Sequence, residues 1–291
     1  MQLTQGLHRA ARIRSETMAT VDGPRSRSWK QVRLDVARLA TLIRQCGIGP
    51  GDRVAVLAHN SDHYFDAYYA VFWAGAVIVP LNTRLSTPEL EFQLRDVGAA
   101  LLFHGDDFEA VAAELAQALP GMICIDFDEA GGELRQRIAT LDPAPDANRS
   151  DADVAGIFYT GGTTGLPKGV MLTHRNLVSV ADNLIMMIRF SELCVNLHCA
   201  PMFHLAAIGL FTVTMTGGTH VFAQRLDAET IMRDIEAHRV THAFSVPAII
   251  DTLARTEPGR HDLHSLKMLG YGGSPMPDAT LIRAQARFPG I

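Results

Sequence analysis

Residues 159–169 read Tyr-Thr-Gly-Gly-Thr-Thr-Gly-Leu-Pro-Lys-Gly. This stretch holds four glycines, three threonines and one lysine, and apolar runs at 155–158 and 170–173 flank it. Short apolar runs bounded by turn residues are typical of buried strands, so the pattern predicts strand, polar loop and strand. Glycine lets a backbone approach a ligand closely, and successive backbone N–H groups form an anion-binding concavity. The stretch therefore indicates a loop that holds a polyphosphate.

Two other kinds of loop also carry clustered glycines. A phosphate-binding loop of the Walker type requires Gly-x-x-x-x-Gly-Lys-[Ser/Thr] leading into a helix. Here Lys168 follows proline and precedes glycine, and a strand-like run comes next, so that motif is excluded. An ordinary glycine-rich hairpin stays open, because glycine is the default turn residue. The hydroxyls of Thr160, Thr163 and Thr164, together with the lysine charge, argue against the ordinary hairpin without removing it.

The stretch resembles the phosphate-binding signature of the adenylate-forming (AMP-binding) superfamily, and we identify the chain with its acyl-CoA synthetase branch. Acyl-CoA synthetases, aryl-CoA ligases, luciferases and peptide-synthetase adenylation domains carry Tyr-Thr-Ser-Gly-Thr-Thr-Gly-x-Pro-Lys-Gly. The present sequence departs from this pattern at Gly161, where serine is usual, which removes one hydroxyl. The resemblance implies that Lys168 is also a catalytic residue. It assigns the ATP phosphates to Thr160, Gly161, Gly162, Thr163, Thr164, Gly165 and Lys168.

The segment Pro201-Met202-Phe203-His204 lies where a predicted strand gives way to a predicted helix. Ligands of open α/β sheets gather at the carboxyl ends of strands. Taken alone, His204 fits a structural histidine better than a catalytic one. The segment resembles the family's Pro-x-Phe-His, whose histidine lies beside the acyl carbonyl, and this resemblance makes His204 a catalytic candidate. Relatives that activate amino acids carry aspartate there, so we expect no α-amino-acid substrate.

Two further segments resemble pocket walls of the family. Residues 272–275 (Gly-Gly-Ser-Pro) resemble a Gly-Gly-x-Pro turn that packs against adenine and lines the acyl pocket, and residues 244–247 (Phe-Ser-Val-Pro) resemble another wall. The local pattern also predicts Ser274 as the N-cap and Pro275 as the first residue of the last helix. The resemblance assigns the adenine and acyl pocket to Phe244, Val246, Gly272, Gly273, Ser274 and Pro275.

Composition excludes several classes of protein. Of the 291 residues, 47% are hydrophobic and 20% charged, as in globular proteins, and the net charge of −5 argues against a nucleic-acid partner. The longest apolar run, residues 70–81, is shorter than the roughly 20 residues of a membrane span, so no integral membrane segment is expected. The four cysteines form no Cys-x-x-Cys pair, which predicts reduced thiols, a cytoplasmic location and no metal site.

Apolar runs that read as strands alternate with helical patterns along most of the chain. Helices are predicted from 29, where Ser28 and Gln31 form a capping box, and over 61–74, whose aromatic residues are expected in the core. The alternation predicts an α/β protein with mostly parallel strands. Residues 141–153 are predicted to be an exposed connector.

The resemblance implies the large N-terminal domain of the acyl-CoA synthetase and luciferase-like fold, in which two sheet subdomains sandwich helices. The first α/β subdomain is expected to span 51–190, and the second to combine 1–50 with 191–291. Family motifs beyond these segments, including a Mg²⁺-holding glutamate and a C-terminal lid domain with a catalytic lysine, do not occur. We therefore expect an incomplete, C-terminally truncated AMP-binding domain that is inactive in adenylation by itself.

The resemblance implies that the complete enzyme uses ATP, Mg²⁺ and coenzyme A to convert a small carboxylic acid, fatty or aryl, into its acyl-CoA. Two alternatives stay open, a non-catalytic nucleotide- or acyl-binding module and an inactive truncated product. A homodimer is also left open. Ala206, Ala207 and Gly209 follow the candidate histidine. Their small side chains either leave room for an acyl chain or serve helix packing.

Overall fold

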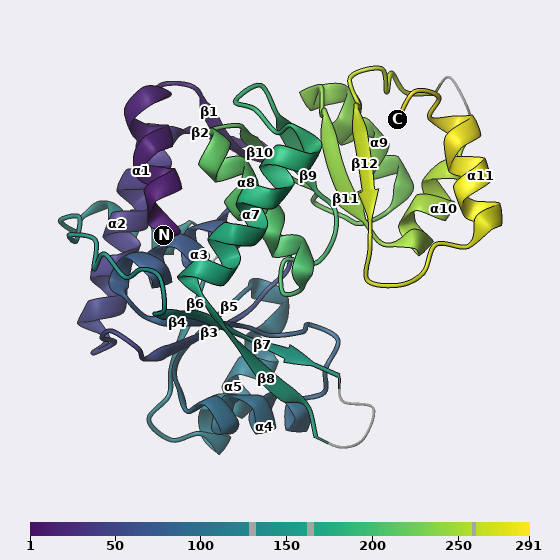
Figure 1. Ribbon diagram of the computed structural model, residues 1–291. Coiled ribbons are helices and arrows are strands. Elements are labelled where there is room, and N and C mark those ends of the chain that lie inside the picture. The colour runs from purple at the N-terminus through teal and green to yellow at the C-terminus, as the bar shows by residue number, and fades with distance from the viewer. Residues whose placement is uncertain (128–131, 162–165, 258–259) are drawn as a thin grey trace.

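The computed structural model describes residues 1–127, 132–161, 166–257 and 260–291, which form two six-stranded sheets (Figure 1). The strands of sheet A are β1 (Met18–Asp22), β2 (Arg25–Ser28), β9 (Val195–His198), β10 (Thr219–Phe222), β11 (His242–Ser245) and β12 (Met268–Tyr271). Those of sheet B are β3 (Arg53–Leu57), β4 (Val77–Pro80), β5 (Ala99–His104), β6 (Ile123–Asp126), β7 (Val154–Thr160) and β8 (Lys168–Thr173).

Strand order brings distant parts of the chain together. Sheet A runs β12-β11-β9-β10-β1-β2, so β1 pairs in parallel with β10 from the second half of the chain. Sheet B runs β6-β5-β3-β4-β7-β8. Among the described residues the pairs β1–β2 and β7–β8 are antiparallel and the others parallel, so the predicted mostly parallel α/β class is confirmed.

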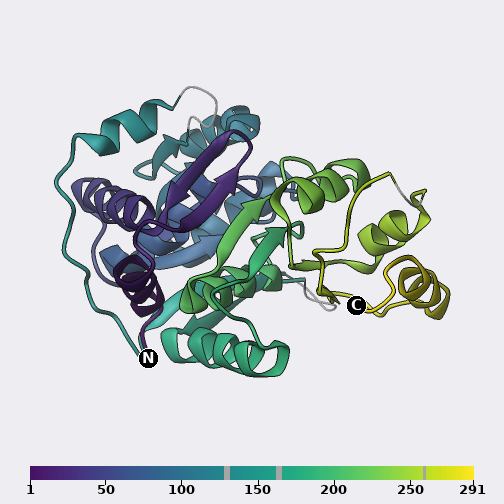
Figure 2. The same cartoon turned by 90° about the horizontal axis from the view of Figure 1, so that it is seen from above.

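A layer of helices lies between the two sheets (Figures 1 and 2). Its members are α1 (Thr4–Ile13), α2 (Trp29–Gln45), α3 (Asp62–Ala74), α7 (His174–Ile188) and α8 (Ile208–Thr216). Helix α3 contacts β1 of sheet A and β3 of sheet B, while α8 contacts β9 and β10. The predicted sandwich of helices between two sheets is therefore confirmed.

The remaining helices cover other surfaces. Those are α4 (Thr87–Val97), α5 (Glu109–Ala118), α6 (Glu133–Ala139), α9 (Ala228–His238), α10 (Pro247–Arg255) and α11 (Asp278–Arg287), with short 3₁₀ turns at Asp106–Phe108 and Leu205–Ala207. Helix α5 packs on β5 and β6 of sheet B, α9 packs on β9 of sheet A, and α6 packs on α2. No helix formed by the described residues is long and apolar enough to cross a membrane.

The aromatic helix α3 is the centre of the core. Its six aromatic side chains are at most 3% exposed, and Tyr64, Tyr68, Phe65 and Tyr69 stack along the helix. The predicted assignment of these residues to the core is confirmed. Burial of these large side chains stabilises the central layer by about 25 cal/mol per Å² of apolar surface removed from water.

One local prediction is accurate in detail, and one strand was not predicted. Ser28 caps α2, with Gln31 N donating to Ser28 Oγ at 3.3 Å and Ser28 N donating to Gln31 Oε1 at 2.7 Å. Strand β2 was not predicted, because Arg-Ser-Arg-Ser lacks apolar alternation and extends only by pairing with β1.

The predicted connector over 141–153 is present, but it is only partly exposed. Trp73 Nε1 donates to Ala144 O at 2.8 Å, and His8 Nε2 lies 2.8 Å from Asp146 Oδ2. The segment is without regular structure but many of its residues are half-buried, because helices α1 and α3 bind it through side chains that are distant in sequence.

Each sheet draws its strands from a separate part of the chain. Sheet B uses residues 53–173, and sheet A uses residues 18–28 and 195–271. We propose that the chain consists of two subdomains, 51–190 and 1–50 with 191–291, as predicted above. This distribution of strands supports that division.

Candidate functional site

Strands β7 and β8 form the hairpin that carries the signature stretch. Thr160 and Lys168 pair across it, and both are exposed at its tip, as is Gly161. Tyr159 anchors the hairpin, because its hydroxyl donates to Asp96 Oδ2 on α4. The two expected strands are present. Four assigned phosphate ligands lie outside the described residues: Gly162, Thr163, Thr164 and Gly165.

Gly169, the last residue of the signature, is required by packing. A Cβ at this position would lie 2.7 Å from Ile157 Cγ2, and a Cβ on Gly156 would lie 2.7 Å from Phe158 Cε2. Real Cβ atoms do not approach so closely, so larger residues would displace these side chains. The hairpin therefore depends on glycine inside its strands.

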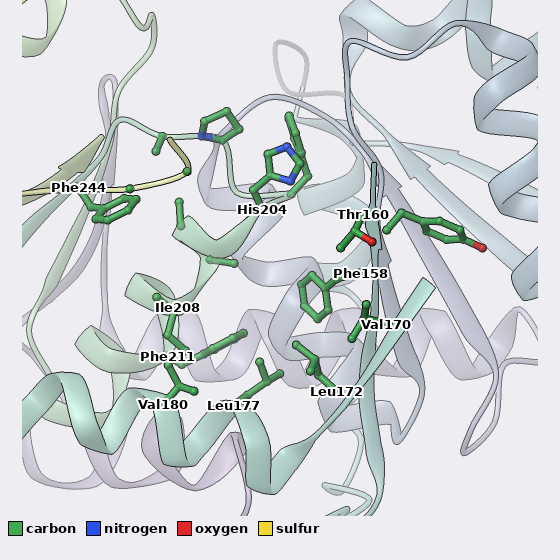
Figure 3. Close-up of a pocket in the computed structure, with 18 of the residues that line it drawn as sticks. Phe158, Thr160, Val170, Leu172, Leu177, Val180, His204, Ile208, Phe211 and Phe244 are labelled. Atoms are coloured by element: carbon green, nitrogen blue, oxygen red, sulfur yellow. The ribbon is translucent and has the colours of Figure 1, made fainter. Parts of the chain in front are cut away.

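A cavity of about 520 Å³ opens between the hairpin and sheet A (Figure 3). Phe158, Val170 and Leu172 of the hairpin form one side, and residues of α7 and α8 form the floor. Six predicted site residues line it: Thr160, His204, Phe244, Val246, Gly272 and Gly273. Lys168, Gly161, Ser274 and Pro275 are not among the lining residues. The structure thus brings segments more than 100 residues apart to one apolar cavity.

His204 lies at the rim of this cavity, in the loop after β9. Asn60 holds that loop, since its Nδ2 donates to His198 O at 3.1 Å and Ala200 O at 2.8 Å, and Met202 N donates to its Oδ1 at 2.9 Å. Partial removal from water, with the nearby positive charge of Arg84, lowers the pKa of His204. The imidazole is therefore neutral near pH 7, able to form hydrogen bonds but without a fixed charge.

The wall opposite the hairpin depends on glycines facing Phe244. A Cβ on Gly272 would lie 2.9 Å from Phe244 Cζ, and one on Gly270 would lie 3.1 Å from its Cδ2. Gly273 has φ +84°, a left-handed conformation that favours glycine. These positions leave the phenyl ring room to lie along β12 and to face the cavity.

The prediction that Ser274 caps the last helix is wrong. Helix α11 begins at Asp278 and its N-cap is Pro277. Proline disfavours helical conformation in the preceding residue, so Met276 cannot lie in a helix that starts at Pro275. Both Ser274 and Pro275 are exposed.

Sequence patterns alone did not identify most of the apolar lining. The missed residues are Phe158, Val170, Leu172, Leu177, Val180, Ile208 and Phe211. Those on β8 share a strand face at a spacing of two, and those on each helix lie three apart. This periodicity is the same for residues that fill a core and residues that line a cavity, so it could not separate the two.

The hairpin, the rim histidine and the glycine wall meet around one apolar cavity. Residues 7–291 match the AMP-binding enzyme family, and the chain belongs to that family. The chain is 36% identical over 276 residues to a feruloyl-CoA synthase of Amycolatopsis sp. and 34% identical over 263 residues to the long-chain-fatty-acid–CoA ligase FadD13 of Mycobacterium tuberculosis. These alignments cover 92% and 86% of this chain but 54% and 52% of the relatives, so the chain spans about half their length.

Solved structures agree with this assignment. The inhibitor-bound N-terminal domain of FACL13 from Mycobacterium tuberculosis matches with a TM-score of 0.89 at 30% identity, over 98% of this chain and 73% of that one. The o-succinylbenzoate-CoA synthetase MenE of Bacillus subtilis, in complex with its acyl-adenylate intermediate, matches with a TM-score of 0.86 at 27% identity, over 97% and 71%. The predicted relationship to acyl-CoA synthetases and the predicted fold are confirmed.

Proposed function

We propose that this chain supplies the ATP- and acid-binding part of an acid–thiol ligase, an acyl-CoA synthetase for a fatty or aryl carboxylic acid. The observation that carries the proposal is the convergence of the hairpin tip, His204 and the Phe244–Gly272 wall on one apolar cavity. An apolar cavity suits an acid with an apolar body. Membership of the AMP-binding family supports ATP and coenzyme A as the other substrates.

The proposed reaction has two steps. A carboxylate oxygen attacks the α-phosphorus of ATP, the bond from that phosphorus to pyrophosphate breaks, and acyl-AMP forms. The thiolate of coenzyme A then attacks the acyl carbon, and AMP leaves with the bonding electron pair. Positioning and charge stabilisation dominate such phosphoryl chemistry, so the hairpin loop and the Lys168 charge are proposed to hold the β and γ phosphates.

His204 is proposed to orient the carboxylate at the rim of the cavity. Because its lowered pKa keeps the ring neutral, it offers a hydrogen bond without the strong ion pair that would make the carboxylate a poorer nucleophile. Phe244, Val246, Gly272 and Gly273 are proposed to form the wall for the adenine and acyl groups.

Mg²⁺ is proposed to arrive bound to ATP. Among the described residues, no group of three or more His, Cys, Asp or Glu side chains is arranged to hold a metal ion. Mg²⁺ commonly keeps several waters and binds substrate phosphates with one or two carboxylates, which fits this arrangement. A cytoplasmic location and a homodimer stay predictions.

Calorimetric titration with ATP and with a non-hydrolysable acyl-sulfamoyl adenosine tests the proposal. We expect saturable binding of both ligands, and Lys168→Ala should weaken ATP binding about tenfold through loss of a charge-assisted contact. Lys267→Ala, at the opposite end of β12 from Gly272, is the matched control and should bind normally. Absence of saturable binding by the unsubstituted chain would refute the proposal.

Acid-dependent pyrophosphate exchange separates a ligase from a non-catalytic binding module. We expect exchange from the longer protein that carries this chain and little or none from residues 1–291 alone. Nucleotide binding without any exchange by the longer protein would favour the binding module.

A further inference from the structure

A second cavity of about 340 Å³ adjoins the first, between α7, α8 and sheet A. We call it the inner chamber. The residues that line both cavities are Val180, Ala200, Ala206, Ile208 and Phe244. This shared wall includes two alanines, which present little bulk between the cavities. The inner chamber therefore extends the apolar space of the proposed acid site away from the His204 rim.

The inner chamber is apolar along most of its length but has a polar end. Asn196 and His198 of β9 line it and are 5% and 4% exposed. Because they are two residues apart on a strand, their side chains share one face. Gly209 of α8 lies opposite: a Cβ there would be 3.7 Å from Asn196 Nδ2 and 3.7 Å from His198 Cε1. The helix thus presents no side chain where these two polar groups meet the chamber.

The hydrogen bonds of this polar end leave one donor and one acceptor unused. His198 Nε2 lies 3.0 Å from His220 Nδ1 and 3.4 Å from Asn196 Nδ2. With the Asn196 amide assigned as donor, His198 Nε2 accepts and the ring proton lies on Nδ1. Within the part of the chain that the structure describes, His198 Nδ1 and Asn196 Oδ1 form no hydrogen bond.

The low exposure of His198 and Asn196 makes the unused hydrogen-bonding atoms of these two side chains important for binding. Burial lowers the pKa of His198 to about 3, so the ring is neutral and carries a single N–H. A polar group that is shut off from water without gaining a hydrogen-bond partner destabilises the state that buries it. A ligand group that satisfies both atoms would recover that cost, whereas a purely apolar ligand end would leave them unpaired.

We propose that the inner chamber binds the distal end of the acid and selects a hydroxyl group there. A hydroxyl both donates and accepts, so one group can donate to Asn196 Oδ1 and accept from His198 Nδ1. This inference rests on the proposed acid-activating function and narrows its substrate to acids whose apolar body, aryl or aliphatic, ends in a hydroxyl. It also assigns Ala206 and Gly209 to making room for the acyl group, one of the two roles that the sequence left open.

The test compares analogues that differ only in the distal hydroxyl. The probes are the sulfamoyl adenosines of para-hydroxycinnamate and cinnamate, and of an ω-hydroxy fatty acid and its parent acid. Calorimetry on this chain should give a dissociation constant about tenfold lower for the hydroxylated member of at least one pair. Equal affinity within both pairs would overturn the inference but leave the proposed function standing. Absence of binding by all four analogues would overturn both.

Two variants assign the effect to the polar end. Asn196→Leu removes the acceptor at similar volume, and Gly209→Ala places a methyl group between the two polar side chains at ordinary contact distance. Each should abolish the preference for the hydroxylated analogue, so that the two members of a pair have equal dissociation constants. Gly209→Ala keeps the test decisive if Asn196→Leu does not fold. The matched control Asn183→Leu, exposed on α7, should keep the preference. A preference that persists in the folded inner-chamber variants would overturn the inference.

Discussion

Arg27 on β2 is the centre of a buried charge cluster that joins the edge of sheet A to α3. Its Nη1 and Nη2 lie 2.8 and 3.0 Å from the two carboxylate oxygens of Asp66, and its Nη2 lies 3.3 Å from Asp62 Oδ2. The Arg27 side chain is 10% exposed and that of Asp66 is 4% exposed. Arg27→Met should destabilise the fold, because it leaves the buried Asp66 carboxylate without its bidentate partner.

The size of the effect follows from the burial of this pair. Removing one partner of a buried ion pair costs about 3–5 kcal/mol. Arg135 Nη1 remains 3.3 Å from Asp66 Oδ2, so we expect the lower end, about 3 kcal/mol. For a chain of 291 residues that corresponds to a fall in melting temperature of roughly 5 °C.

The loss should depend on pH. Burial raises the pKa of Asp66, and removing the Arg27 charge raises it further. A raised folded-state pKa contributes stability below the unfolded value that is lost as pH rises through the folded value. The deficit of Arg27→Met should therefore be larger at about pH 8 than at about pH 5.

Urea unfolding followed by circular dichroism measures these differences. Arg33→Met on the exposed face of α2 is the control and should change the free energy of unfolding by less than about 0.5 kcal/mol. The double variant Arg27→Met with Asp66→Leu should recover most of the loss, because no buried charge is stranded. The reasoning is refuted if Arg27→Met matches the control, or if the double variant is less stable than the single one.

Three further predictions concern the site and its pH range. Gly272→Ala should press on the Phe244 ring and weaken acyl-adenylate binding about tenfold by calorimetry; unchanged affinity would show that the wall is not rigid. Asn60→Ala strands the backbone groups of the loop after β9, so urea unfolding should show a loss of about 2 kcal/mol, and a loss near zero would contradict the anchoring role. Burial lowers the pKa of His198 to about 3 and of His174 to about 4. The stability that each neutral histidine contributes is present above the unfolded pKa of about 6.5 and is lost as pH falls through the folded values. Each histidine should therefore lower the free energy of unfolding by about 2 kcal/mol between pH 7 and pH 5. Buried carboxylates with raised pKa oppose this loss, and His174→Gln should reduce the pH dependence; an identical dependence in that variant would contradict the assignment.

Features with local causes were predictable. The capping box at Ser28 and Gln31 depends on residues three apart, and the strand–loop–strand pattern of residues 159–169 depends on a short apolar and glycine pattern. The signature also identified the family, because nine of its eleven consecutive positions match a specific residue of the family pattern. In each case the stabilising partners lie close together in the chain.

Features with distant partners were not predictable. Strand β2 exists because β1 pairs with it and because Arg27 finds carboxylates on α3, and the connector over 141–153 is bound by side chains more than 70 residues away. Asn60 belongs to no sequence motif, yet its hydrogen bonds hold the loop after β9 that contains His204. The start of α11 was misjudged because one local signal, a serine before a proline, competed with a second proline two residues later.

The sequence by itself determined the family, the α/β class, the capped start of α2 and the candidate residues of the hairpin and the rim. Tertiary structure alone decided which apolar residues line the cavity and which fill the core, since both obey the same periodicity. It also decided that Asn196 and His198 face an adjoining chamber opposite Gly209. Whether a side chain packs against a neighbour or faces an open space depends on elements that are far away in the chain. A local sequence pattern contains no information about where those elements lie.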